Sequence, residues 1–309
     1  MTRPVRFATQ TGGAPTAEEW FARAKRIEAM GYDTLAMPDH MVGGAWAAMP
    51  ALAALAQVTS KLRFGTLVID NDFRNPVVFA REVAVLDVLS GGRFELGMGA
   101  GWFDRDYQGT GIPFDRGRVR VARLAEAITL MKRLFTEEQV DFGGTYYKVE
   151  KAECRPKTIQ QPHPPLMIAG GGPEILALAG REANIVAVVP AGITGSGKLA
   201  TDAVTLDTMK KQAQIVRDAA GPGADEIEYS IFLDCVLTDD RDKTIAGMAE
   251  TAKVDPALIQ NSAYRGIGTL PEITTHIRKV RDEVGITYFC LRGPDVEKLG
   301  PILSELSGR

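Results

Sequence analysis

The sequence lacks the features on which several classes of protein depend. It has only three cysteines, Cys154, Cys235 and Cys290, and none has the Cys-x-x-Cys or Cys/His spacing of a metal site. Isolated cysteines of this kind commonly pack in cores, so we expect neither a bound metal nor a disulfide. The amino-terminus has no apolar signal core, and no apolar run approaches the ~18 residues of a membrane-spanning helix. We therefore expect a cytoplasmic protein with no membrane partner.

An excess of charge of either sign is also missing. The formal net charge is −3, whereas proteins that bind nucleic acid carry a basic surface. Of the 309 residues, 45% are hydrophobic and 24% are charged, which is typical of a globular protein. We therefore expect no nucleic-acid partner, and ligands that are small molecules or further copies of the chain.

Short apolar runs alternate with longer amphipathic stretches along the whole chain. The runs that we predict to be strands lie at 5–8, 34–37, 62–69, 94–98, 166–169, 185–189, 227–237 and 287–291. A helical stretch follows each of them, and strands joined through helices pair in parallel. Eight such units predict a single-domain TIM (β/α)8 barrel over 1–309, with insertions in the loops at the C-terminal face of the strands. An open, doubly wound sheet is the alternative.

The stretch RFELGMGAGW, residues 93–102, resembles a dinucleotide-binding turn because glycines occupy every second position after an apolar run. A dinucleotide turn normally lies in the first βαβ unit, with an acidic residue about 20 positions later. Here the glycines follow the fourth predicted strand, and arginines stand at the later position. Two interpretations remain: the glycines let the chain bend off a barrel strand, or they leave room for a flat ligand in the barrel mouth.

Polar residues follow several predicted strands at the face where barrel enzymes carry their active sites. His40, with Asp39 before it, comes directly after strand two and is one of only three histidines. Imidazole transfers protons near neutral pH, which favours a catalytic role. The alternative is a capping Asp39 beside a histidine that satisfies a backbone group. At the end of strand three, Asp70 and Asn71 either line the mouth or form a turn.

Strand five ends in Ala169 and is followed by Gly170, Gly171 and Gly172 at the start of a helix. Exposed backbone N–H groups at the positive end of a helix dipole suit an anionic phosphate, although a plain tight turn is the alternative. The glycine-rich residues 190–198 have no apolar periodicity and predict a mobile loop on the same face.

Several of these pieces together resemble one family, the bacterial luciferase-like flavin and deazaflavin oxidoreductases. The resemblance is carried, in order, by the segments 31–33, 38–40, 62–68, 89–97, 99–102, 161–165 and 169–171, which read GYD, PDH, LRFGTLV, LSGGRFELG, GAGW, QPHPP and AGG. It covers nearly the whole chain. The branch that uses coenzyme F420 is the most similar, and members that use FMN share most of these motifs.

The resemblance implies a TIM barrel with the cofactor in its C-terminal mouth. It places the tricyclic ring against strand three at Leu67 and Val68, whose peptide bond is expected to be cis. His40 and Asp39 would face the reactive edge of the ring. The remaining cofactor contacts that it implies are Asp70, Asn71, Gly99, Trp102, Ala169, Gly170, Gly171 and Gly172.

One departure from the family bears on the substrate. Sugar-phosphate dehydrogenases of this family carry an acid where this chain has Trp102. We therefore expect an apolar or planar substrate, in a pocket shaped by Trp46 and Trp102, with Lys198 as a possible contact from the 190–198 loop.

The expected activity is hydride transfer between F420 and that substrate, in a homodimer served by a separate F420- or flavin-reducing enzyme. An FMN-dependent two-component monooxygenase is the first alternative, and a non-catalytic cofactor-binding barrel is the second.

Overall fold

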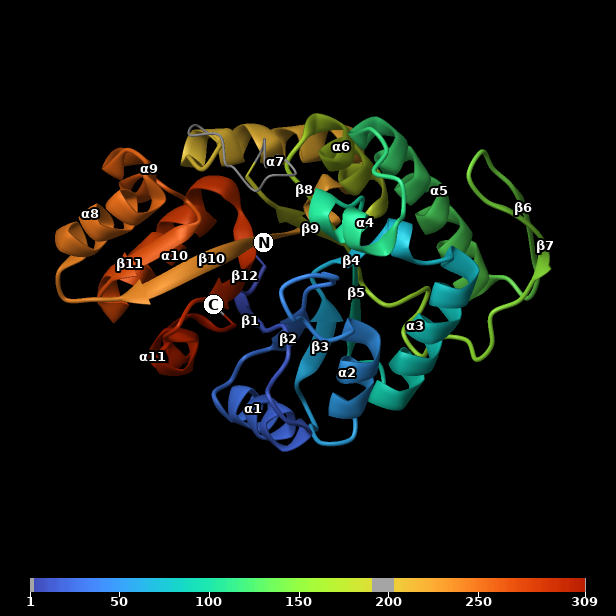
Figure 1. Ribbon diagram of the computed structural model, residues 1–309, viewed down its shortest axis with the longest axis horizontal. Coiled ribbons are helices and arrows are strands. Elements are labelled where there is room, and N and C mark those ends of the chain that lie inside the picture. Colours follow the sequence, from blue (N-terminus) through green and yellow to red (C-terminus); the bar gives the residue numbers. More distant parts are fainter. Residues whose placement is uncertain (1–2, 191–202, 309) are drawn as a thin grey trace.

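In the computed structural model, which describes residues 3–190 and 203–308, eight parallel strand positions close into a barrel (Figure 1). The barrel strands are β1 (Arg6–Gln10), β2 (Thr34–Met37), β3 (Arg63–Thr66) continued by β4 (Ile69–Asp70), β5 (Phe94–Gly99), β8 (Leu166–Gly170), β9 (Ile185–Val188), β10 (Glu228–Leu237) and β12 (Ile286–Arg292). Pairing of β10 with both β9 and β12, and of β12 with β1, closes the ring. The TIM barrel is therefore confirmed, and the open sheet is wrong.

Amphipathic helices surround this barrel and bury their apolar faces against it. They are α1 (Ala17–Ala29), α2 (Ala48–Leu55), α3 (Pro76–Ser90), α5 (Gly117–Thr136), α6 (Pro173–Glu182), α7 (Leu206–Ala220), α10 (Leu270–Val284) and α11 (Gly300–Leu306). Their ends follow local chemistry. Asn75 caps α3 before a proline, and Gly91 ends it in the left-handed region at φ 63°.

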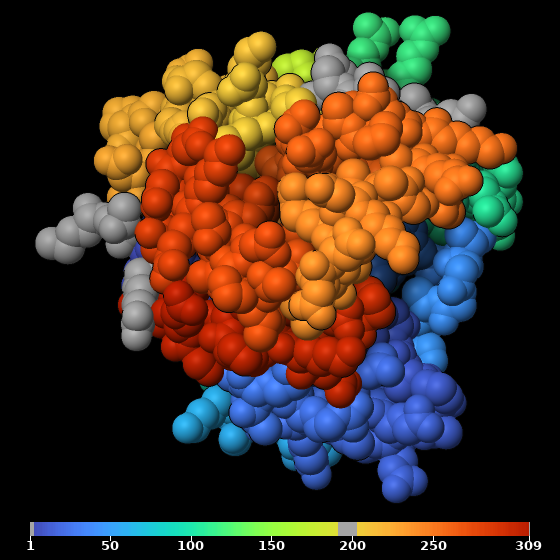
Figure 2. All heavy atoms as spheres, turned by 90° about the vertical axis from the view of Figure 1, so that its left-hand side faces the viewer, coloured from blue at the N-terminus to red at the C-terminus, as the bar shows by residue number. Residues whose placement is uncertain are grey.

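The two ends of the chain meet on one side of the molecule. Figure 2 shows the last segments, in red, lying against the first helical segment, in blue. The hydroxyl of Tyr32 donates to the carbonyl of Val296 at 2.9 Å, and Arg26 pairs with Glu297 at 3.2 Å. These contacts support the closure between β12 and β1.

Several elements differ from the sequence prediction. Helix α4 (Asp104–Thr110), strand β11 (Arg265–Gly268) and helix α9 (Pro256–Gln260) were not predicted, and the predicted strand 62–69 is divided into β3 and β4. Both α4 and β11 are short and contain glycine, so neither has a clear period. The helical stretch predicted after the last strand is divided into η3 (Val296–Lys298) and α11. Between α5 and β8 an antiparallel hairpin is formed by β6 (Val140–Gly143) and β7 (Lys148–Ala152).

The glycines at the end of β5, the fourth predicted strand, and just after it face protein atoms and leave no open space. A Cβ on Gly97 would lie 1.9 Å from the carbonyl oxygen of Thr66, and one on Gly99 would lie 2.8 Å from a methyl of Val68. Gly101, at φ +76°, is packed in the same way against the hydroxyl of Tyr107. The glycines thus permit close approach of the β3–β4 segment and of α4. The interpretation that their missing side chains make room for a flat ligand is wrong.

A cluster of buried charge fills the opposite, amino-terminal end of the barrel. Glu95 accepts from Arg6 at 2.5 Å, from Arg63 at 2.8 Å and from the hydroxyl of Tyr288 at 3.0 Å. Arg6 also pairs with Glu228 at 2.6 Å. Burial by itself would raise the pKa of Glu95, but the two guanidinium groups outweigh it and hold the pKa below its usual value.

Candidate active site

His40 lies just beyond the C-terminal end of β2, at the face where barrel enzymes hold their catalytic groups. Its Nδ1 is 2.6 Å from Oδ2 of Asp106, a residue 66 positions away on α4. The other oxygen of Asp106 accepts the backbone N–H groups of Met41 at 2.8 Å and Val42 at 3.1 Å. Asp106 is buried, whereas the His40 side chain keeps 33% of its surface exposed. Asp106 therefore holds the imidazole at Nδ1, on the side away from the barrel mouth, and the rest of the ring remains open to the mouth.

Two aromatic side chains flank the imidazole. Trp102 and Phe103 meet His40 edge to face, with ring centroids 6.0 and 5.9 Å away. Trp102 keeps 42% of its surface exposed, so one part of its ring is available to a ligand. The structure thus brings the predicted Trp102 beside the predicted His40. Phe103 was not predicted.

Asp39 is adjacent to His40 in sequence but is bound to other groups. Its Oδ1 accepts from Arg74 at 2.9 Å, and its Oδ2 accepts from both Arg74 and the backbone N–H of Asp70, the latter at 3.1 Å. The carboxylate is buried. Both oxygens are therefore committed to holding the end of β2 against the β4 segment.

Leu67 and Val68, which are predicted to contact the cofactor ring, lie at a break in the third barrel strand. The Leu67–Val68 peptide bond is cis, as expected, and it separates β3 from β4. The side chain of Gln10 donates to the carbonyl of Leu67 at 2.6 Å. Leu67 is buried and Val68 half-buried, so an apolar shoulder stands beside the barrel mouth.

Asp70 and Asn71 turn toward protein partners. Asp70 caps the short helix η1 (Asn71–Phe73) by accepting from Asp72, and the hydroxyl of Tyr107 donates to it at 3.2 Å. Burial, with the nearby Asp72 carboxylate adding to it, raises the pKa of Asp70 to about 7. Asn71 donates to the hydroxyl of Tyr147 at 3.2 Å. Of the two interpretations of this segment, the turn is confirmed.

Gly170 ends β8, and Gly171 and Gly172 connect it to the amino-terminus of α6. Gly172 is its N-cap and supplies no side-chain hydrogen bond, and nothing lies within 4 Å of where its Cβ would be. Gly171 is packed tightly, since its Cβ would lie 2.6 Å from the carbonyl of Val189. The side-chain amide of Gln212 donates to the carbonyls of Gly171 and Val189, each at 2.9 Å. The result is an open, positive helix end next to Ala169 and Gly170.

Trp46 is largely used to anchor its own loop. Its ring packs against Gly13 at φ +134° and lies 5.9 Å from the ring of Trp20, and the backbone N–H of Trp46 donates to the carbonyl of Gly12. The predicted contact Lys198 lies outside the described residues.

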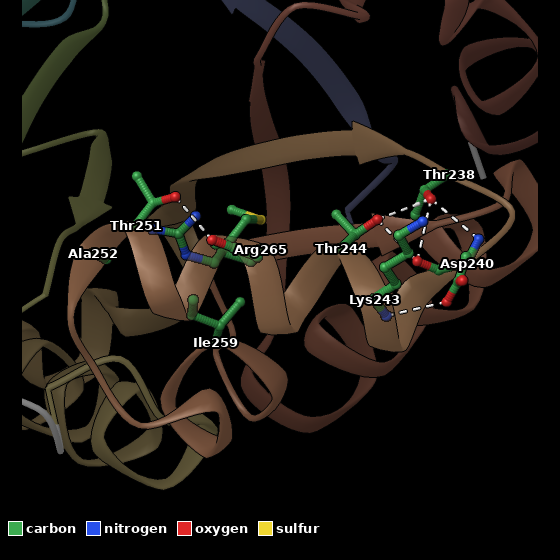
Figure 3. Close-up of a pocket in the computed structure, with 10 residues that line it drawn as sticks. Thr238, Asp240, Lys243, Thr244, Thr251, Ala252, Ile259 and Arg265 are labelled. Carbon is green, nitrogen blue, oxygen red and sulfur yellow. Dashed lines mark hydrogen bonds between the residues drawn. The ribbon is translucent and has the colours of Figure 1, made fainter.

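A groove on the described part of the chain is lined by none of these predicted site residues (Figure 3). It runs along α8 (Arg241–Ala252), between Thr238 and Asp240 at one end and Ile259 and Arg265 at the other.

Among the residues with described positions, no group of three His, Cys, Asp or Glu side chains is placed to hold a metal ion. No helix in the described ranges is long and apolar enough to cross a membrane.

Asp106 is the principal site residue that sequence reasoning missed. It lies in a polar stretch with two glycines, where no apolar periodicity marks a helix. The available signal was a pair of acids, Asp104 and Asp106, which are favoured in the first turn of a helix. Nothing local indicated that one of them would reach His40.

A parallel barrel with an imidazole–carboxylate pair in its mouth, beside an aromatic surface and an open helix amino-terminus, has the parts of an acid–base site for a small ligand. The family model described as luciferase-like monooxygenase matches residues 1–282, and the chain belongs to this family. An F420-dependent glucose-6-phosphate dehydrogenase of Intrasporangium calvum is 36% identical over 168 residues, 52% of this chain and 50% of the relative. The chain spans about half the length of the first curated relatives that it matches.

Two solved structures share the fold at low sequence identity. One is the coenzyme F420-dependent tetrahydromethanopterin reductase of Methanopyrus kandleri, with a TM-score of 0.80 and 20% identity over 98% of each chain. The other is an F420-dependent secondary alcohol dehydrogenase in complex with an F420-acetone adduct, with a TM-score of 0.79 and 21% identity over 98% of each chain.

Proposed function

We propose that this protein transfers a hydride between coenzyme F420 and a small apolar or planar organic substrate. The observation that carries the proposal is the position of His40: an imidazole held from behind, open to the barrel mouth and flanked by Trp102. The names of the relatives, which include F420-dependent dehydrogenases, support the choice of cofactor. We also propose that 1–309 is one domain, because β12 and β1 pair in the same barrel.

The residues present fit such a cofactor. The apolar shoulder at Leu67 and Val68 suits one face of a flat ring, and the uncapped start of α6 at Gly172 suits its phosphate. When bound, F420 supplies the carbon that accepts or gives the hydride. Asp70, Asn71 and Gly99 would support this platform through the protein rather than by direct contact, because their neighbours occupy them.

His40 would hold or release the proton that accompanies the hydride. Asp39 would position the loop that carries His40, since Arg74 and the N–H of Asp70 take both its oxygens. The partly exposed ring of Trp102 would exclude water and favour an apolar or planar substrate.

A binding titration tests the cofactor. We expect F420 to bind, and Gly172→Asp to weaken its binding on the order of tenfold or more, because a second negative charge would meet the phosphate at the start of α6. The position has φ −85° and open space, so the variant should fold. Gly172→Asn is the matched control, with the same shape and no charge, and should bind nearly as wild type.

Binding of FMN with no binding of F420 would overturn the proposal and favour the FMN-dependent two-component monooxygenase, since the family model is described as luciferase-like monooxygenase. Oxygen consumption with reduced FMN and substrate would then be the positive test. Binding of F420 without turnover of any alcohol or carbonyl compound would favour a cofactor-binding barrel.

We propose that the protein forms a homodimer through the exposed face of α3. This face carries Val78, Val85 and Leu89, which keep 59%, 38% and 49% of their surface exposed, around Arg81 and Glu82. A two-fold axis that crosses two antiparallel copies of α3 would set Arg81 against Glu82 of the second copy and Val78 against its Val85. The face is thus complementary to itself in charge and in apolar surface.

Sedimentation tests this dimer. We expect the wild type to sediment as a dimer and Val85→Glu to sediment as a monomer, because each interface would bury two unpaired carboxylates. Val254→Glu is the matched control, since Val254 is also 38% exposed but lies after α8, and it should remain a dimer. A monomeric wild type, or a dimeric Val85→Glu variant, would show that α3 is not the interface.

We further propose a separate enzyme that restores the F420, because hydride transfer leaves the cofactor in the opposite oxidation state. The three cysteines are free and buried, which supports a reducing compartment such as the cytoplasm.

A further inference from the structure

We propose that Asp106 is the positioning residue that fixes the tautomer of His40, with Nδ1–H directed at Asp106 and Nε2 left free for the proton of the substrate. This inference rests on the proposed function for its chemical meaning, but the tautomer itself is a property of the protein alone.

The surroundings of Asp106 are those of a carboxylate that only accepts hydrogen bonds. Oδ1 receives two backbone N–H groups, from Met41 and Val42, and Oδ2 faces Nδ1 of His40 at 2.6 Å. A carboxylate has no proton to donate, so the hydrogen of this contact lies on Nδ1. In a neutral imidazole the other nitrogen, Nε2, then carries a free lone pair.

The position of Asp106 is fixed by the residue that follows it. Tyr107 is buried, and its hydroxyl donates to Asp70 at 3.2 Å and to Asp72 at 3.1 Å. Helix α4 therefore presents two consecutive buried side chains, one toward His40 and one toward the segment after β4. The carboxylate is held at a set distance from the imidazole before any ligand binds.

The pair also accounts for the proton in the reaction. In the oxidising direction the C–H bond of the substrate breaks, and the hydrogen leaves with both bonding electrons as a hydride that the cofactor would accept. The proton of the hydroxyl or amine on the same carbon moves to Nε2, and a C=O or C=N bond forms. The resulting imidazolium faces the Asp106 carboxylate, which stabilises its charge. The reducing direction reverses each of these steps.

The Asp106 carboxylate lies four residues after Trp102 in the sequence and contacts the imidazole of His40 through Nδ1. Trp102 can therefore form an apolar side of the mouth while the charge balance of His40 is kept.

Asp106→Asn gives a direct test. The asparagine oxygen can still accept from Met41 and Val42, which keeps the loop in place, but its NH2 group would now face Nδ1. Nδ1 must then accept, and the hydrogen moves to Nε2. Long-range ¹H–¹⁵N spectra of the cofactor-free protein, recorded at a pH where the imidazole is neutral, distinguish the two tautomers.

The chain supplies its own references. His163 contacts the carbonyl of Pro164 through Nδ1 at 2.8 Å, and His276 contacts the carbonyl of Ala263 through Nε2 at 3.1 Å. A carbonyl can only accept, so these two residues mark the Nδ1–H and Nε2–H patterns. His40 should match His163 in the wild type and in the control Asp104→Asn, on the same turn of α4. In Asp106→Asn it should match His276.

A wild-type His40 with the Nε2–H pattern, or an Asp106→Asn variant that keeps the Nδ1–H pattern, would overturn the inference. Because no cofactor is present, this result is independent of the proposed function. If the tautomer changes as expected but F420 does not bind, the role of Asp106 stands and the F420 proposal fails.

Discussion

His40→Ala is expected to lower the rate of hydride transfer about 10²–10⁴-fold, the usual effect of removing a general acid or base. In the proposed reaction a proton accompanies the hydride, and His40 is the imidazole at the C-terminal face of the barrel, with 33% of its side-chain surface exposed. His163 and His276 are bound to backbone carbonyls elsewhere. The measurement is the change in F420 absorbance with cyclohexanol, or with cyclohexanone and reduced F420.

Binding and chemistry must be separated in this experiment. F420 affinity should change little in His40→Ala, because the platform at Leu67 and Val68 and the start of α6 are untouched. Gln108→Ala is a suitable control, since Gln108 is exposed on the same short helix as Asp106. Equal rates in the wild type and in His40→Ala would show that His40 does not transfer the proton.

Glu95→Gln is expected to lower the free energy of unfolding by about 3–5 kcal/mol, the range for breaking a buried ion pair by removing one partner. Glu95 is buried and lies between the guanidinium groups of Arg6 and Arg63. Arg6 would keep Glu228, but Arg63 would lose its carboxylate partner inside the barrel. Denaturant unfolding followed by circular dichroism measures the difference.

The same substitution should change the response to acid. The pKa of Glu95 is held below its usual value in the folded protein, so its contribution to stability is present above the pKa of the unfolded state and is lost as the pH falls through the folded pKa. The wild type should therefore lose more stability on acidification than Glu95→Gln. Glu150→Gln, on the exposed side of hairpin strand β7, is the control and should behave as wild type. Parallel acid curves for the wild type and Glu95→Gln would contradict this assignment.

Local patterns were sufficient for the barrel and for the position of His40. The period of apolar residues marked each barrel strand, and the loop after a strand of a parallel barrel must open at one face. The resemblance to the family added the cis bond at Leu67–Val68, which the structure contains. The prediction for the glycines of β5 was wrong because the neighbour of Gly97, Thr66 of β3, is set by pairing between strands.

The sequence by itself determined the eight barrel strands and most of the helices between them, because that choice depends on apolar periodicity and on capping residues within a few positions. Only the tertiary structure decided which side chains meet. His40 contacts Asp106, which is 66 residues away in the sequence. Arg6 pairs with Glu95 and Glu228, which are 89 and 222 residues away. Such pairs follow from the register with which the barrel closes, and that register is the joint result of packing by all the strands and helices around it.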